Sequence, residues 1–237
     1  MEGITSNLEL LSALGLFVGM GDIYLARMTK EDTASTPPEY ATPYLAMEGI
    51  RCGLTPQYAE GKQSASDRTI RNIRLLTGMD VAMEYARVLA EVRCDVLGRT
   101  MDERGGELVA DGMAPYFGVG VLATRDDGTC LMRWIYKVRF SEGAGEMRTM
   151  EDGTITYQIP TLEGKGVRLA YGVARGEGKI EHPVQYEMDT ANGKCKMDVN
   201  SFFAQVQGPW VPVETSAKLD SADGAPVLTA ATAKAAK

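Results

Sequence analysis

The chain has 237 residues, of which 44% are hydrophobic and 24% charged, and 25 Lys and Arg against 32 Asp and Glu give a net charge of −7. At about 150 residues per domain this length predicts one or two domains, with a core large enough to need no metal or disulfide. The composition excludes a disordered, collagen-like or coiled-coil chain. The acidic balance argues against a protein that wraps nucleic acid, because Lys and Arg supply most of that affinity.

The cysteines and the start of the chain bear on the compartment. Cys52, Cys94, Cys130 and Cys195 lie far apart without any Cys-x-x-Cys, which excludes a zinc-knuckle or thioredoxin-type motif. Scattered single cysteines are typical of reduced thiols and indicate cytosolic synthesis. No Lys or Arg precedes Arg27, so no secretory signal is predicted, and no apolar run near the start is long enough for a membrane span.

In the first third of the chain, the sequence predicts strands separated by long connections. Residues 1–13 are expected to be an irregular or short helical lead-in. Residues 16–28 are β-rich and hold two glycines, which predicts a strand with a bend or bulge. After a Pro- and Thr-rich loop, residues 45–58 predict one or two strands. Residues 58–76 are polar, carry charges of both signs and have no clear period, so we expect a long extended loop or a projecting hairpin; connections of this length are usually functional.

The spacing of apolar residues changes from that of a strand to that of a helix within residues 79–97. Residues 79–86 alternate, which predicts a half-buried strand. One face would carry Val81, Met83 and Tyr85, and the other Asp80, Ala82 and Glu84. Residues 87–97 then predict an amphipathic helix that ends at Gly98. Its apolar stripe would be Val88, Leu89, Val92, Val96 and Leu97.

The second half predicts β-structure throughout. Residues 116–124 and 130–140 flank an Asp-Gly pair, which is a strong hairpin signal. In the second of these strands, alternation predicts one apolar face of Met132, Trp134, Tyr136, Val138 and Phe140. The opposite face would carry Arg133, Ile135, Lys137 and Arg139. We expect these three basic residues under the helix or at the outer surface, paired with acids.

A second hairpin is predicted from residues 154–162 and 166–174, with its turn at residues 163–165. One more strand follows at residues 184–188. Residues 199–206 predict a short helix with Phe202, Phe203 and Val206 directed inward.

These elements predict a mainly β fold, a β-sandwich or barrel-like domain with one flanking helix and a long projecting loop. The expected organisation is an N-terminal lead-in (1–13), one domain (14–212) and a flexible Ala-rich tail (213–237).

A search for catalytic chemistry finds little. His182 is the single histidine, and beside Pro183 at a strand start it is expected at the surface, so neither a Ser-His-Asp set nor a zinc site is readily built. The run from Gly118 to Ala123 fits the dinucleotide fingerprint formally, but a strand passes through it and no helix follows. Glycines that allow close packing are the better interpretation. No catalytic, metal or cofactor-binding residues are predicted, which favours a protein that works by contact with other proteins.

Several segments, taken in order, give the chain a family resemblance. It resembles the major tail protein, or tail tube protein, of long non-contractile-tailed bacteriophages and prophages, over about residues 16–190. The segments that carry the resemblance are Gly21-Asp-Ile-Tyr24-Leu-Ala26-Arg-Met with Tyr40-Ala-Thr-Pro43, the helix end Val96-Leu97-Gly98, Ala114-Pro115-Tyr116-Phe117 leading to Trp134-Ile-Tyr136-Lys-Val-Arg-Phe140, and Thr154-Ile-Thr-Tyr-Gln158-Ile-Pro160-Thr-Leu-Glu-Gly164. No single motif is specific, and the order and spacing make the likeness.

The resemblance implies a structural role without catalysis. Such proteins are β-sandwiches with a flanking helix that assemble into hexameric rings, and the rings stack into the tube through which the genome leaves the virion. The architecture is similar to the tube protein of contractile injection systems. The implied partners are copies of itself, the tape measure, terminator and distal tail initiator proteins, and DNA that passes without specific binding. The implied location is the virion tail, after synthesis in the host bacterial cytoplasm.

The residues add three expectations to this family picture. Unpaired strand edges would become ring-closing surfaces. A ring of six copies at −7 each would carry −42, and acidic groups facing the bore would repel DNA phosphates; Asp80 and Glu84 are the lumen-facing candidates. Residues 58–76 would form an inter-subunit or inter-ring arm in which arginines pair with acids on a neighbour. The arm candidates are Tyr58, Asp67, Arg68, Arg71 and Arg74.

Other functions stay open from the sequence. A capsid decoration or tail terminator subunit would share this composition and would differ in its assembly form. A carboxylate-dependent hydrolase is a further alternative, since any two of the 32 acids could serve as an acid–base pair.

Overall fold

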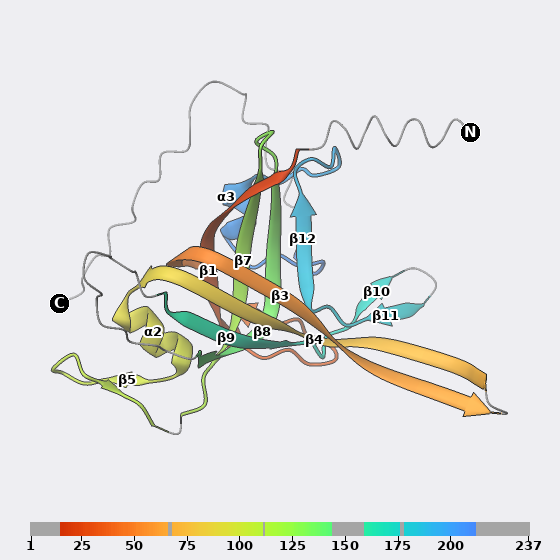
Figure 1. Ribbon diagram of the computed structural model, residues 1–237, viewed down its shortest axis with the longest axis horizontal. Helices are drawn as coiled ribbons and strands as arrows, with labels where there is room; N and C mark the ends of the chain where they lie inside the picture. Colours follow the sequence, from red (N-terminus) through yellow and green to blue (C-terminus); the bar gives the residue numbers. More distant parts are fainter. Residues whose placement is uncertain (1–14, 66–67, 111, 144–158, 176–177, 212–237) are drawn as a thin grey trace, which may run out of the picture.

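The computed structural model describes residues 15–65, 68–110, 112–143, 159–175 and 178–211 (Figure 1). The predicted lead-in (1–13), the predicted tail (213–237) and the predicted strand at 154–158 lie outside these residues. The strands are β1 (Phe17–Lys30), β2 (Glu39–Tyr40), β3 (Tyr44–Ala65), β4 (Arg68–Val88), β5 (Thr100–Met101), β6 (Glu107–Leu108), β7 (Tyr116–Arg125), β8 (Cys130–Glu142), β9 (Thr161–Val167), β10 (Val173–Arg175), β11 (Lys179–Glu181) and β12 (Gln185–Asp189). The helices are α2 (Ala90–Leu97) and α3 (Val199–Phe203).

One antiparallel sheet organises the molecule and closes on itself. Its strand order is β12-β8-β7-β1-β3-β4-β9, and β9 also pairs with the second half of β8. The strands from β8 round to β9 therefore form a barrel, while β12 pairs with the first half of β8 and extends the sheet beyond it. The fold is mainly β, as the sequence predicts, and it is barrel-like.

The main core lies inside this barrel. Inward residues of β4 alternate as predicted, with Val81, Met83 and Tyr85 buried, while Asp80 and Glu84 lie on the outer face. Helix α2 adds Val96 and Leu97 to the same core. The helix ends where predicted, because Gly98 has a φ of 66°, a left-handed conformation that glycine adopts without strain.

The start of this helix differs from the prediction. Val88 belongs to β4, and Leu89 is the N-cap residue with an extended backbone and an exposed side chain. The predicted five-residue stripe is therefore wrong at Leu89. The strand runs directly into the helix. No residue in the sequence marks this junction, so the helical spacing of apolar residues could be extended from Val92 back to Val88 and Leu89.

A bulge in β8 overturns the predicted faces of that strand. Phe117 pairs with Val138 and Val119 with Ile135, so Tyr136 and Lys137 lie together opposite Gly118, and Lys137 has a φ of 47°. An extra residue shifts the alternation by one. Ile135, Val138 and Phe140 consequently enter the barrel, whereas Met132, Trp134 and Tyr136 face the other side of the sheet.

The outward aromatic residues form a second core under α3. Phe203 stacks on Tyr24 with ring centroids 4.4 Å apart, and the indole N–H of Trp134 donates to the carbonyl of Phe202 at 3.1 Å. Asp198 caps the helix by accepting from the Ser201 amide at 2.7 Å. The helix is shorter than the predicted 199–206, but the predicted inward residues Phe202, Phe203 and Val206 are buried.

The predicted turn at residues 163–165 is wrong. These residues lie in the middle of β9, which pairs with β4 on one edge and with β8 on the other. Gly164 permits this, because a Cβ there would lie 2.7 Å from Val138 and 2.8 Å from Phe140. The glycine therefore marks a close approach inside the barrel rather than a chain reversal.

Candidate assembly surfaces

The longest hairpin of the molecule projects from the barrel. β3 and β4 pair as far as Ala65 and Arg68, but β9 accompanies β4 only up to Gly78. Beyond that point the two strands continue as a two-stranded ribbon that extends away from the barrel (Figure 1). We call its residues 58–65 and 68–76 the arm. The structure thus confirms the projecting-hairpin form that the sequence left open for residues 58–76.

The arm has two different faces near its base. Register pairs Glu60 with Arg74 on one face, where the Arg74 guanidinium also lies over the Tyr58 ring, 3.8 Å from its centroid. The opposite face pairs Ala59 with Leu75 and Gly61 with Ile73. Ile73 and Leu75 are 49% and 47% exposed. An isolated two-stranded ribbon is marginally stable at best, so an exposed apolar stripe on one favours contact with a partner.

The predicted arm residues are distributed along this ribbon. Tyr58 and Arg74 lie at the base, where Arg74 pairs with Glu60 at 3.3 Å within the same arm. Arg68 and Arg71 are in β4, opposite Ala65 and Gln63. Asp67 falls outside the described residues. Pairing of these arginines with acids on a neighbour stays a prediction.

The outer face of β3, β4 and β9 is polar. Adjacent rows across the three strands hold Arg51, Glu84 and Thr161, then Gly53, Ala82 and Glu163, then Thr55, Asp80 and Lys165. None of these side chains is both large and apolar. Alternation predicts such a face as solvated.

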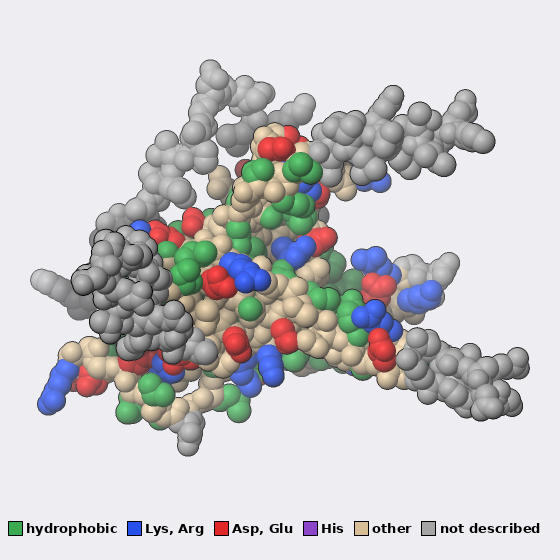
Figure 2. Space-filling view, in the orientation of Figure 1, with side chains coloured by type: hydrophobic (Ala, Val, Ile, Leu, Met, Phe, Trp, Pro, Cys, Tyr) green, Lys and Arg blue, Asp and Glu red, His purple; other side chains and the backbone are tan. Residues whose placement is uncertain are grey.

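The two lumen-facing candidates lie on this outer face and are held by neighbours. Gln57 donates to Asp80 at 2.5 Å, and Arg51 pairs with Glu84 at 3.3 Å. With Glu163 and Lys165 the rows contain three acids and two bases, so the face is mixed in charge rather than uniformly acidic. Figure 2 likewise shows acidic and basic side chains interspersed over one face of the molecule. Whether this face lines a bore stays a prediction.

The three basic residues of β8 do not share a face, because the bulge separates Arg133 from the other two. Arg133 pairs with Glu187 of β12 at 2.9 Å, and Lys137 pairs with Asp32 at 2.8 Å. Arg139 lies over the Tyr116 ring, 3.9 Å from its centroid. Two of the three are therefore paired with acids, as expected, and the third stacks on an aromatic ring. The predicted placement is wrong for Arg133, which shares the inner face of the sheet with Ile135 instead of lying under the helix or at the outer surface.

Free strand edges are a further surface that the sequence indicated only in general terms. β12 ends the strand order of the sheet. Pairing between β1 and β3 ends at Ile23 and Met47. β1 extends from Ile23 back to Phe17 and β3 extends from Met47 onward, so each presents an edge there that is unpaired within the described residues. Such edges accept further strands readily.

Chemically reactive groups are sparse in the part of the chain that the structure describes. No cluster of three or more His, Cys, Asp or Glu side chains suited to a metal ion occurs there. His182 is exposed, as predicted. The four cysteines are free thiols, and burial raises the pKa of Cys52 to about 11 although Arg133 opposes this, so that thiol stays protonated. Among the described helices, neither has the length and hydrophobicity to cross a bilayer.

Comparisons with known proteins find little similarity. No protein-family model and no curated protein matches the chain. Among solved structures, a chain of the cryo-EM structure of the anti-feeding prophage baseplate, symmetrised six-fold, aligns with a TM-score of 0.32 and 9% identity. The alignment covers 74% of this chain and 97% of that chain. At this distance it does not establish a family.

Proposed function

We propose that this protein is a structural subunit of a phage tail, and that it forms the tail tube as stacked hexameric rings. The observation that supports this most is the arm, which extends a two-stranded ribbon with an apolar stripe beyond the barrel that supports its base. The order and spacing of segments resembling tail tube proteins supply the particular assembly. The role is non-enzymatic, and the genome passes through the tube.

Each assembly surface has a place in this proposal. The free edges of β1, β3 and β12 pair with neighbouring copies around the ring, which closes the edges as cyclic symmetry requires. The arm reaches a neighbouring copy within or between rings. The outer face of β3, β4 and β9 lines the bore, where Asp80, Glu84 and Glu163 repel phosphates and Arg51 and Lys165 are too few to bind DNA firmly. Tape measure, terminator and distal tail initiator proteins complete the tail.

Substitution of the apolar stripe tests the part played by the arm. Ile73→Ser with Leu75→Ser is expected to abolish large assemblies in sedimentation velocity, because the stripe loses its hydrophobic contact area. Thermal unfolding of the barrel should change little, since both side chains are half exposed in the single chain.

Glu60→Gln on the opposite face of the arm is the matched control and should leave assembly intact. Assemblies of unchanged size from the double variant would contradict the proposed role of the arm. Closed trimers or single rings that do not stack, formed by the unmodified protein, would favour a decoration or terminator subunit instead.

A further inference from the structure

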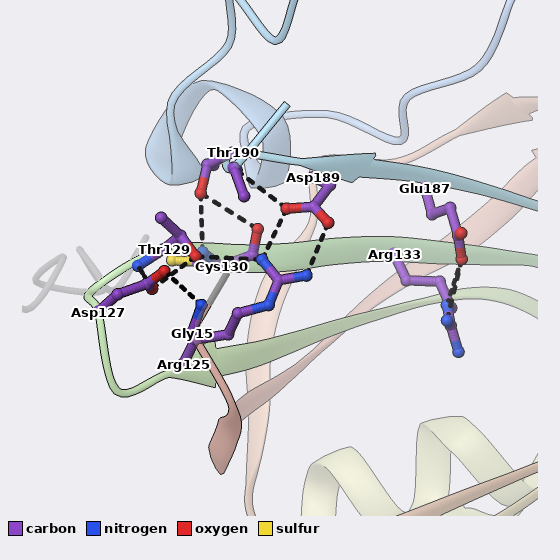
Figure 3. Close-up of polar contacts among 10 residues, drawn as sticks. Gly15, Arg125, Asp127, Thr129, Cys130, Arg133, Glu187, Asp189 and Thr190 are labelled. Atoms are coloured by element: carbon purple, nitrogen blue, oxygen red, sulfur yellow. Dashed lines mark hydrogen bonds and ion pairs between the residues drawn. The ribbon is translucent and has the colours of Figure 1, made fainter. Parts of the chain in front are cut away.

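A groove opens where β1 and β3 part, and its lining is mostly apolar. It has a volume of about 240 Å³ and lies between the inner face of β1, β7 and β8 and the inward side chains of β3. The side chains that matter most here are Met20, Cys52, Leu54, Val121, Leu131 and Arg133. Arg133 already pairs with Glu187 at 2.9 Å (Figure 3), and the Cys52 thiol is uncharged at neutral pH, so the groove favours an apolar occupant.

The backbone beside the groove can accept another strand. Between Phe17 and Asp22, β1 has a described partner on one edge only, which is β7. Beyond Met47, β3 likewise pairs with β4 alone among the described strands. Extended segments bind sites of this kind by pairing with the free edge while their side chains enter the adjacent groove.

The arm has both features that such an occupant needs. Its two outer edges have no partner among the described strands, because β9 accompanies β4 only up to Gly78 and β1 pairs with β3 only up to Met47. Its apolar face carries the half-exposed side chains of Ile73 and Leu75. The residues opposite them on that face are the small Ala59 and Gly61, so the ribbon can approach a groove closely while its two large side chains enter.

Charge also matches the arm to this end of the barrel. Residues 58–76 hold four bases and two acids, a net charge of +2, so the rest of a chain with −7 in total carries −9. Three acids lie beside the groove. Asp22 is in the free segment of β1, and Asp126 and Asp127 accept hydrogen bonds at 2.8 Å from the amides of Leu16 and Gly15, just before β1 begins (Figure 3).

The two bases nearest these acids are already neutralised. The Arg125 side chain is buried and pairs with Asp189 at 2.6 Å, and Arg133 pairs with Glu187 (Figure 3). Figure 2 shows acidic side chains at the outer end of the β7–β8 hairpin. The rim of the groove is therefore acidic, and a basic ribbon would be attracted to it.

The arm of the same chain cannot fill this groove. Cys52 and Leu54 belong to the same continuous strand as the arm, and β3 stays paired with β4 from these residues to the arm. The arm extends away from the barrel (Figure 1), so it would have to break this pairing to fold back. An arm in the groove must come from another copy.

We propose that the arm of a second copy adds along the free edge of β1, with Ile73 and Leu75 in the groove between β1 and β3. The inference rests on the self-assembly proposed above and names the surface that receives the arm. Because the arm and the groove are different parts of the chain, the contact is heterologous. Each copy can therefore give its arm to one neighbour and receive an arm from another, as a closed ring requires.

Photo-cross-linking of the full-length protein tests this inference. Leu75 is replaced by the photoreactive residue p-benzoylphenylalanine, and the isotope-labelled variant is mixed with unlabelled native protein, concentrated and irradiated. Mass spectrometry is expected to find links from position 75 to Met20, Leu54 or Leu131 of the unlabelled copy. The same photoreactive residue in place of Arg74, on the opposite face of the arm, is the matched control and should give at least several-fold fewer of these links.

Charge variants test the inference without a bulky residue in the interface. Arg68→Glu with Arg71→Glu changes the net charge of residues 58–76 from +2 to −2 and leaves the apolar stripe intact. Sedimentation velocity at low salt should show association weakened several-fold, because the arm would then repel the acidic rim. Asp22→Lys added to this double variant should restore part of the lost association.

The outcomes separate this inference from the proposed function. Links from position 75 within one chain, links that map outside the groove, or equal yields from positions 74 and 75 would overturn the inference. The absence of links, together with association unchanged by the charge reversal, would overturn it as well. Tubes seen by electron microscopy without links into the groove would leave the proposed function standing. Links into the groove from assemblies that stop at dimers would support the inference and contradict the hexameric rings.

Discussion

At the scale of single residues, Asp32 joins three parts of the barrel that are distant in sequence. Its fully buried carboxylate accepts from Lys137 Nζ at 2.8 Å, from the Tyr171 amide at 3.0 Å and from the Ala170 amide. It thereby neutralises the lysine of the β8 bulge and fixes the chain that follows β9. Burial alone would raise the pKa of Asp32, but the hydrogen bonds and charge of Lys137 and the amides outweigh this and lower the pKa.

Asp32→Asn is therefore expected to lower the free energy of unfolding by about 3 kcal/mol, because it leaves Lys137 buried without its main counter-charge. Urea denaturation at pH 7 measures this. Glu31→Gln removes an exposed partner of the same lysine and should cost about 0.5 kcal/mol or less. Equal losses from both variants would show that the buried carboxylate has no special role.

The lowered pKa of Asp32 also predicts a pH dependence. A carboxyl whose folded pKa lies below its unfolded value stabilises the fold above the unfolded pKa of about 4 and loses this contribution as pH falls through the folded pKa. The stability difference between the native protein and Asp32→Asn, measured by urea denaturation across pH, should hence be constant at neutral pH and shrink below about pH 4.

At the scale of elements, glycines let helix and sheet approach closely. A Cβ at Gly120 would lie 2.9 Å from both Phe203 and Trp134, and one at Gly118 would lie 3.2 Å from Tyr40. This supports the interpretation that the Gly-x-Gly run of β7 serves close packing.

Gly120→Val should accordingly destabilise the fold by about 1–3 kcal/mol, since added methyl groups would force α3 away from the sheet. Near-ultraviolet circular dichroism would report the disturbed Trp134. Gly61→Ala in the arm, where a Cβ meets nothing within 4 Å, is the control and should change stability by less than about 0.5 kcal/mol. Wild-type stability for Gly120→Val would mean that α3 packs more loosely than described.

The elements also show which features a sequence can reveal. The alternation of residues 79–86 and the Asp-Gly turn between β7 and β8 are local signals, and the structure confirms both. The bulge at Tyr136 and Lys137 has no such signal, because one residue with positive φ, held by Asp32 from a distant loop, reverses the strand's faces. Gly164 resembles a turn residue in the sequence because the side chains that approach it, Val138 and Phe140, belong to another strand.

The candidate assembly surfaces could likewise be predicted from the sequence only in part. The arm could be located from its length and lack of period, but its pairing register, and with it the apolar stripe of Ile73 and Leu75, required the structure. The groove between β1 and β3 had no signal in the sequence. It exists because two strands that pair at one end part at the other, which is a property of the closed sheet.

At the scale of the whole molecule, the described part of the chain combines one barrel with several surfaces that have no partner among the described residues. Beside its core it presents a long ribbon with an apolar stripe, unpaired edges on β1, β3 and β12 among the described strands, and a mostly apolar groove where β1 and β3 part. Features of this kind are liabilities in a monomer and become interfaces in a symmetric assembly. The central claim is accordingly that copies of this chain complete one another.

Negative-stain electron microscopy of the purified, concentrated full-length protein tests this claim most directly. Hollow tubes of uniform diameter are expected, with six-fold symmetry in end-on views, and raising the protein concentration should promote their formation. A protein that stays monomeric at high concentration, and also when mixed with preformed tail initiator complexes, would contradict the claim.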